Sequence, residues 1–158
     1  MSAKVHQYIV DLLWTGNRGE GTVRYSAYER SYTLHVAGKP DIMGSSDPAF
    51  RGDPRWHNPE ELFVAALSSC HMLWFLHLCS EAGVSVVDYI DKAQGSMAVN
   101  ADGSGRFTEV VLHPTVTVAQ HAMLAKIDAL HEAANKMCFL ANSCNFPVRH
   151  VGHASSIE

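Results

Sequence analysis

Residues 58–83 read NPEELFVAALSSCHMLWFLHLCSEAG and predict one long helix at the centre of the fold. Asn58 suits the capping position, Pro59 suits the first turn, and the acidic pair that follows suits the positive end of the helix dipole. Gly83 suits the left-handed residue that ends a helix. Apolar side chains go most of the way round, which is typical of a central helix. We therefore expect a helix over 59–82.

The rest of the chain favours strands and a second helix. Expected strands cover 5–14, 22–27, 31–36, 94–100, 106–118 and 145–151, with a short β-branched run in 84–93, turns at 15–21 and 101–105, a long loop over 38–57 and a helix over 119–140. Strands, helix, strands, helix and strand in this order predict an α+β domain with antiparallel sheets packed on two helices. One domain over 1–158 is expected because no linker or repeat interrupts the chain.

The charge and the apolar pattern limit the class of partner. The chain of 158 residues has a net charge of −4 and no cluster of Lys or Arg, so neither nucleic acid nor an anionic membrane is an expected partner. The N-terminus has no long apolar segment typical of a signal peptide, and no wholly apolar run reaches 18 residues. The run 62–80 contains serine and histidine and favours a buried helix. We expect a cytoplasmic protein.

Four cysteines in a cytoplasmic protein should be reduced at rest, and two of them are placed for thiol chemistry. Cys70 lies in the middle of the first expected helix, and Cys138 lies near the end of the second. Cys144 follows in the next loop or strand, and either of these two could pair with Cys70. Cys79 lies on another face of the first helix and is expected in the core. The ten histidines show neither HExxH nor an adjoining CxxC, so no metal and no cofactor is expected.

Other interpretations of Cys70 remain open from its position alone. A cysteine on an apolar helix is often an inert small apolar side chain. A cysteine hydrolase would need a base such as His71, or a histidine from elsewhere, within hydrogen-bond reach of the sulfur. A metal site made of Cys70, His71 and His77 is disfavoured, because adjacent helix positions diverge by about 100°.

An activating arginine would complete a thiolate site. Glu60 lies ten residues before Cys70 on the same helix, roughly 15 Å along the axis, and reaches it only through a bridging group. Arg18, Arg51 and Arg55 are the candidates in the preceding loops. A guanidinium beside a cysteine lowers the thiol pKa and raises the thiolate fraction.

Three motifs together resemble the OsmC/Ohr family, named for osmotically inducible protein C and organic hydroperoxide resistance protein. The run NPEEL at 58–62, followed by two alanines and Cys70, resembles the family's signature helix. The run WTGNRGEGTV at 14–23 resembles its first hairpin, and CFLANS at 138–143 falls where the family places its second redox cysteine.

The resemblance implies an intertwined homodimer with sheets wrapped around two long central helices and active sites at the dimer interface. It implies reduction of organic hydroperoxides, and often hydrogen peroxide, with Cys70 as the peroxidatic thiolate and Cys138 as the resolving thiol. An external dithiol, such as a lipoyl-type dithiol, would restore the pair. Glu60 would hold the activating arginine, with Arg51 the first choice, Arg18 the second and Arg55 (by position only) the third.

Some residues depart from the family pattern. His71 stands where an aromatic residue is common, Phe139 stands where a proline often follows the second cysteine, and Cys144 is an additional thiol. These departures leave open the preferred peroxide and whether Cys138 or Cys144 resolves. Two rival functions stay in view: a non-enzymatic member that binds a small apolar ligand, and a cysteine hydrolase.

Overall fold

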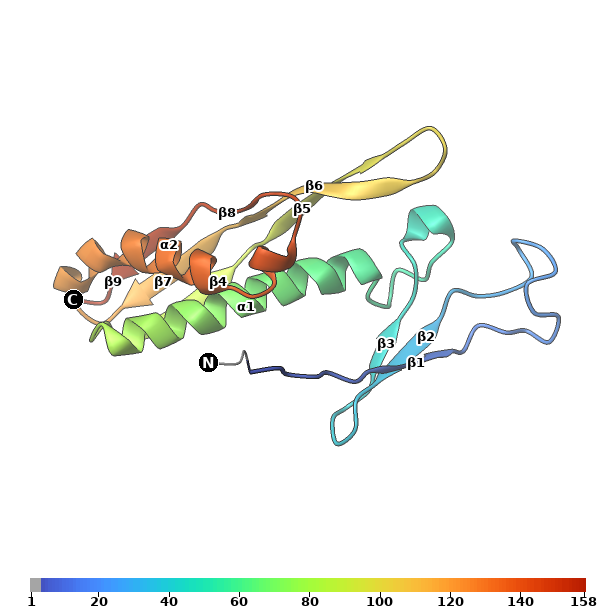
Figure 1. The fold of residues 1–158 in the computed structure, drawn as a ribbon, viewed down its shortest axis with the longest axis horizontal. Coiled ribbons are helices and arrows are strands. Elements are labelled where there is room, and N and C mark those ends of the chain that lie inside the picture. The colour runs from blue at the N-terminus through green and yellow to red at the C-terminus, as the bar shows by residue number, and fades with distance from the viewer. Residues whose placement is uncertain (1–3) are drawn as a thin grey trace. The chain divides into compact units, whose positions relative to one another are not determined.

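The computed structural model describes residues 4–158, which fall into two compact units. The first unit ends at Leu62 and the second begins at Phe63. The long helix α1 therefore begins in the first unit and continues through the second. Figure 1 shows the strands of each unit and the two α-helices.

The first unit contains a small antiparallel sheet. Its elements are β1 (Asp11–Trp14), β2 (Tyr32–His35), β3 (Ile42–Gly44) and a short 3-10 helix, η1 (Pro48–Phe50). The sheet order is β1-β2-β3. The expected strand over 5–14 is thus confined to its last four residues, and the expected loop over 38–57 contains a strand.

The strand expected over 22–27 is wrong, because this segment forms turns instead. The Asn17 carboxamide oxygen accepts the backbone N–H groups of Gly19 and Gly21, and both glycines have positive φ. The Arg30 guanidinium donates to the carbonyls of Tyr25 and Tyr28. Such side-chain bonds to the backbone compete with strand pairing.

Helix α1 (Pro59–Glu81) confirms the expectation for the central helix. The Asn58 side chain accepts the Glu61 N–H at 2.8 Å, and the Glu61 carboxylate accepts the Asn58 N–H at 3.2 Å, which forms a capping box. At the other end Gly83 adopts φ 69°, and Val84 donates to the Cys79 carbonyl. This is the Schellman arrangement that favours glycine.

The second unit contains two three-stranded sheets. Their strands are β4 (Val86–Asp91), β5 (Gln94–Val99), β6 (Gly105–Leu112), β7 (Pro114–Val118), β8 (Val148–His150) and β9 (His153–Ser156). The orders are β4-β7-β9 and β5-β6-β8. The expected antiparallel pairing is found in the first unit and in the pairs β4–β7 and β5–β6, whereas β6–β8 and β7–β9 are parallel, so these two sheets are mixed.

The strand expected over 106–118 is divided between the two sheets at His113. The Asp91 carboxylate accepts the His113 backbone N–H at 2.7 Å, which takes that donor out of the ladder. A second segment of the chain also passes from one sheet to the other, at Gly152, which lies between β8 and β9. A Cβ at Gly152 would lie 3.4 Å from the Pro114 ring and 3.5 Å from the His131 ring, so the backbone passes close to both.

The second expected helix is shorter than 119–140. A 3-10 turn, η2 (His121–Lys126), leads into α2 (Ile127–Met137), and η3 (Ala141–Ser143) follows. Cys138 is extended, with ψ 110°, and its N–H bonds back into the last turn of α2. The Asn142 side-chain amide donates to the Lys136 carbonyl at 2.9 Å. Of the two expected long helices only α1 is long.

Helix α1 is buried along one face. That face presents Leu67, His71, Phe75 and Cys79. Phe75 and Cys79 pack with strands β4 and β7 and with α2, and Leu67 packs with β6. By length and composition alone α1 is long enough to cross a membrane, with hydropathy 1.7 over its most apolar window, but only 22% of that window is buried. Its buried face packs against the sheets and α2 of the second unit.

Candidate functional site

The structure brings Cys70 and Cys138 together in the second unit. Cys70 lies on α1 and is partly exposed, whereas Cys138 directly follows α2 and is 2% exposed. Burial raises the pKa of the Cys138 thiol to about 11, and a hydrogen bond with the Cys70 side chain adds to this increase. The Ala141 N–H donates to the Cys138 sulfur at 3.4 Å. Cys138 therefore keeps its proton beside Cys70.

The two remaining cysteines have other surroundings. The Cys144 sulfur donates to the Leu140 carbonyl at 3.2 Å, and burial raises its pKa. The thiol that lies beside the Cys70 side chain is that of Cys138. Cys79 is 1% exposed, and burial raises its pKa to about 11, which confirms its expected place in the core.

An apolar surface lies on the same stripe of α1 as Cys70. Leu73, Trp74 and His77 follow it by three, four and seven positions and line an open hollow of about 340 Å³. The Trp74 ring meets the Phe139 ring edge to face at 5.5 Å, and Phe139 directly follows Cys138. The hollow is thus bordered by residues adjacent to both cysteines.

Two histidines of the core were missed as a pair by the sequence analysis. His71 and His131 are 1% and 2% exposed, and their ring nitrogens Nε2 and Nδ1 lie 3.0 Å apart. His150 on β8 lies within 5.5 Å of both rings. No spacing signal could have paired positions 71 and 131, because only the packing of α1 on α2 makes them neighbours.

Burial lowers the pKa of both core histidines. The His71 pKa falls to about 4, chiefly through desolvation and then through His150, with Asp91 acting in the opposite direction. The His131 pKa falls to about 3, through desolvation and then through the other two histidines. Both rings are therefore neutral near pH 7. In the part of the chain that the structure describes, neither ring forms a hydrogen bond with Cys70.

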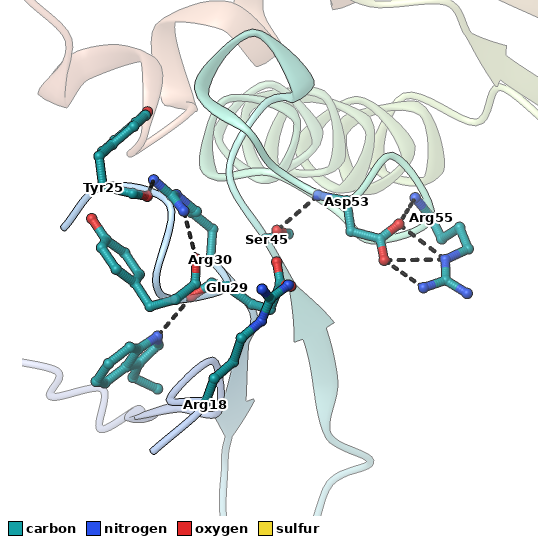
Figure 2. A network of polar contacts seen from close by, with 9 residues as sticks. Arg18, Tyr25, Glu29, Arg30, Ser45, Asp53 and Arg55 are labelled. Atoms are coloured by element: carbon teal, nitrogen blue, oxygen red, sulfur yellow. Dashed lines mark hydrogen bonds and ion pairs between the residues drawn. The ribbon is translucent and has the colours of Figure 1, made fainter. Parts of the chain in front are cut away.

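The predicted arginines lie in the first unit, and Figure 2 shows Arg18 near Glu29 and Arg55 with Asp53. Arg18 pairs with Glu29, and Arg55 forms a bidentate pair with Asp53. Arg51 adopts φ 65° and lies 5.8 Å from the centre of the Tyr25 ring.

Glu60 lies in the first turn of α1, and its charge contributes, after burial, to a raised pKa of Tyr32. Among residues 4–158, no ion pair joins Glu60 to an arginine, and no three His, Cys, Asp or Glu side chains form a group that could hold a metal ion. The roles assigned to Glu60 and the arginines stay predictions.

Comparison with known proteins defines the class. The family model described as OsmC-like protein matches residues 52–150, and the chain belongs to the OsmC family. No functionally curated protein matches the chain. An OsmC-like protein of unknown function from Vibrio cholerae is 31% identical, with a TM-score of 0.83 over 94% of this chain and 99% of that one.

Two more distant structures share the fold. An organic hydroperoxide resistance protein OsmC from Legionella pneumophila is 17% identical, with a TM-score of 0.69 over 97% of this chain and 99% of that one. An organic hydroperoxide resistance protein from Elizabethkingia anophelis is 18% identical, with a TM-score of 0.66 over 96% and 98%. The resemblance noted in the sequence is confirmed.

Proposed function

We propose that the protein is a cysteine-based peroxidase that reduces organic hydroperoxides. The observation that carries this proposal is the proximity of Cys70 and Cys138, one on the long helix and the other at the end of α2. A partly exposed thiol beside a buried, protonated thiol is the arrangement that a peroxidatic and a resolving cysteine require. Names of structural relatives agree with this activity.

The proposed reaction balances over the two sulfurs. The Cys70 thiolate attacks the outer peroxide oxygen, the O–O bond breaks, and the alkoxide leaves and takes up a proton as alcohol. Cys70 is then a sulfenic acid. The Cys138 sulfur attacks it, water leaves, and a disulfide forms. An external dithiol returns two electrons and two protons to the pair.

The resolving role is proposed for Cys138 because its thiol lies beside the Cys70 side chain. Cys138 is protonated at rest, so its S–H can stabilise a neighbouring thiolate. Glu60 and an arginine, with Arg51 first and Arg18 second, are proposed to complete the activation of Cys70. Substitution of Arg51 by Lys should then lower the rate of Cys70 oxidation, because a lysine lacks the bidentate guanidinium.

A homodimer is proposed from the uncovered apolar surface of the same helix. Leu73 on α1, which lines the hollow, is 62% exposed, and Phe139, which contacts the Trp74 ring of the same hollow, is 66% exposed. A second subunit over this face would exclude water from the hydroperoxide and leave an apolar site for its organic group. Cytoplasmic localisation and a dithiol reductant are part of the same proposal.

Single-turnover oxidation tests the activity. The reduced protein is treated with one equivalent of cumene hydroperoxide, and chymotryptic peptides are mapped, since cleavage after Phe139 or Leu140 separates Cys138 from Cys144. Loss of two thiols with a Cys70–Cys138 linkage is expected, and Cys144→Ser should behave alike. Four unreacted thiols at millimolar peroxide would refute the proposal and favour an apolar-ligand-binding protein. Ester turnover that survives Cys138→Ser would favour a hydrolase.

A further inference from the structure

The hydrogen bond between His71 and His131 has a demanding geometry. The planes of the two rings are inclined by 6°, the ring centres lie 5.3 Å apart, and Nε2 of His71 lies 3.0 Å from Nδ1 of His131. The long distance between centres and the short distance between nitrogens together place both nitrogens close to the line that joins the two centres. The hydrogen bond is therefore nearly collinear and lies in the plane of both rings. Such a bond weakens steeply when either ring is tilted or shifted.

The pair is enclosed, and within residues 4–158 no further hydrogen bond is made by either ring. The Phe75 ring stacks on His131 at 3.9 Å, and the Gly152 backbone passes close to the same ring. Among the described residues, the outer nitrogens, Nδ1 of His71 and Nε2 of His131, are buried without a hydrogen bond. Burying two imidazole rings carries a desolvation cost, so the hydrogen bond between them is a poor source of net stability.

The pair also lies close in sequence to both reactive thiols. His71 directly follows Cys70 on α1, and His131 precedes Cys138 by seven residues, or about two turns of α2. The imidazole bond and the thiol contact therefore connect the same two segments at two separate points.

We propose that His71 and His131 are positioning residues whose hydrogen bond fixes α1 against α2 and so holds the Cys70 and Cys138 sulfurs together. The catalytic consequence rests on the proposed peroxidase function, but the positioning is a property of the protein without any substrate. Apolar side chains would fill the same space while tolerating a shift or rotation of α1, whereas the collinear bond does not.

The test is the thiol–disulfide equilibrium of Cys70 with Cys138, measured in a glutathione redox buffer by alkylation and peptide mapping. His71→Leu and His131→Leu should each lower the equilibrium constant for forming this disulfide by about tenfold, the size of one net hydrogen bond. The double Leu variant should also have an equilibrium constant about tenfold below that of wild type, and not a hundredfold below it, because the same hydrogen bond is lost in all three variants.

Stability separates positioning from simple damage to the core. The double Leu variant removes both buried imidazoles, so its urea midpoint should recover toward wild type while its disulfide equilibrium stays impaired. If a single Leu variant does not fold, the double Leu variant is compared with wild type in its place. His131→Asn places an amide near the position of Nδ1 and should restore most of the disulfide equilibrium.

Cys79→Ala is the matched control, because Cys79 is buried on the same face of α1 as His71 and belongs neither to the histidine pair nor to the reactive thiol pair. It should lower the urea midpoint and leave the Cys70–Cys138 equilibrium within twofold of wild type. The proposal is overturned if the His variants stay within twofold of wild type, or if Cys79→Ala weakens the disulfide equally for equal loss of stability. Because no peroxide is used, a failure here is distinct from a failure of the peroxidase proposal.

Discussion

Lowering the pH from 7 to 4.5 should destabilise the folded protein through His71 and His131. In the unfolded chain a histidine takes up a proton as the pH falls through about 6.5. In the folded protein burial holds the His71 pKa at about 4 and the His131 pKa at about 3. Between these values the unfolded state binds more protons, so stability is present above pH 6.5 and is lost as the pH falls.

The structure gives the size of the loss. Each histidine that stays neutral only in the folded state costs about 1.4 kcal/mol per pH unit below its unfolded pKa. For His71 alone this reaches about 3 kcal/mol at pH 4, a large part of the ~5–15 kcal/mol that stabilises a typical domain. The side chain is 1% exposed, so solvent screening does not reduce it much.

Two charged groups near His71 act on its pKa in opposite directions. Asp91 on β4 favours the protonated form of His71, and His150 on β8 opposes it. The carboxylate with a strongly lowered pKa, Asp53 at about 2, titrates below this window. The raised pKa of His35, which is hydrogen-bonded to Asp41, acts in the opposite direction as the pH falls. A variant that lacks both buried histidines therefore isolates their contribution.

Urea unfolding at pH 7, 6, 5 and 4.5 measures the effect, with the double Leu variant at positions 71 and 131 as the control. The wild-type free energy of unfolding should fall steeply below pH 6.5, and the variant should lose most of that slope. Equal slopes for the two proteins, or a flat wild-type curve down to pH 4.5, would refute the reasoning.

Three further changes have defined outcomes. Asn58→Ala removes the capping box and should cost about 1 kcal/mol in urea unfolding, whereas an unchanged midpoint would deny the cap its role. Leu67→Ala opens a cavity at a fully buried position and should cost about 2–5 kcal/mol, and a loss below 1 kcal/mol would mean that the core collapses around it. Cys138→Ser should leave Cys70 as a sulfenic acid that dimedone captures after one equivalent of hydroperoxide, and rapid disulfide formation with Cys144 instead would reassign the resolving thiol.

Local chemistry explains which parts of the fold were predictable. The bounds of α1 follow from Asn58 and Gly83, whose side-chain and φ preferences act within a few residues. The turns at 22–27 were missed, because the bonds from Arg30 to the Tyr25 and Tyr28 carbonyls have no sequence pattern. The parallel pairs β6–β8 and β7–β9 depend on segments far apart in the chain, which periodicity does not connect.

The candidate site also has one part that the sequence predicts and another that depends on packing. The positions of Cys70 and Cys138 were predictable, since each lies at a recognisable point of a helix and within a family motif. The contact between the two sulfurs is a property of the packing of α1 on α2. His131 was invisible for that reason: its partner is 60 residues away and both rings are buried among apolar side chains.

The two contacts between α1 and the α2 segment restrict different motions because they leave α1 in different directions. Adjacent positions such as Cys70 and His71 point about 100° apart around the helix axis. A single contact would allow α1 to rotate about it, whereas two contacts about 100° apart oppose both rotation and sliding. Closing a disulfide requires the sulfurs to meet at about 2.05 Å within a narrow range of torsion angles. A rigid imidazole hydrogen bond beside two thiols therefore favours a disulfide that must form and break repeatedly in the same geometry.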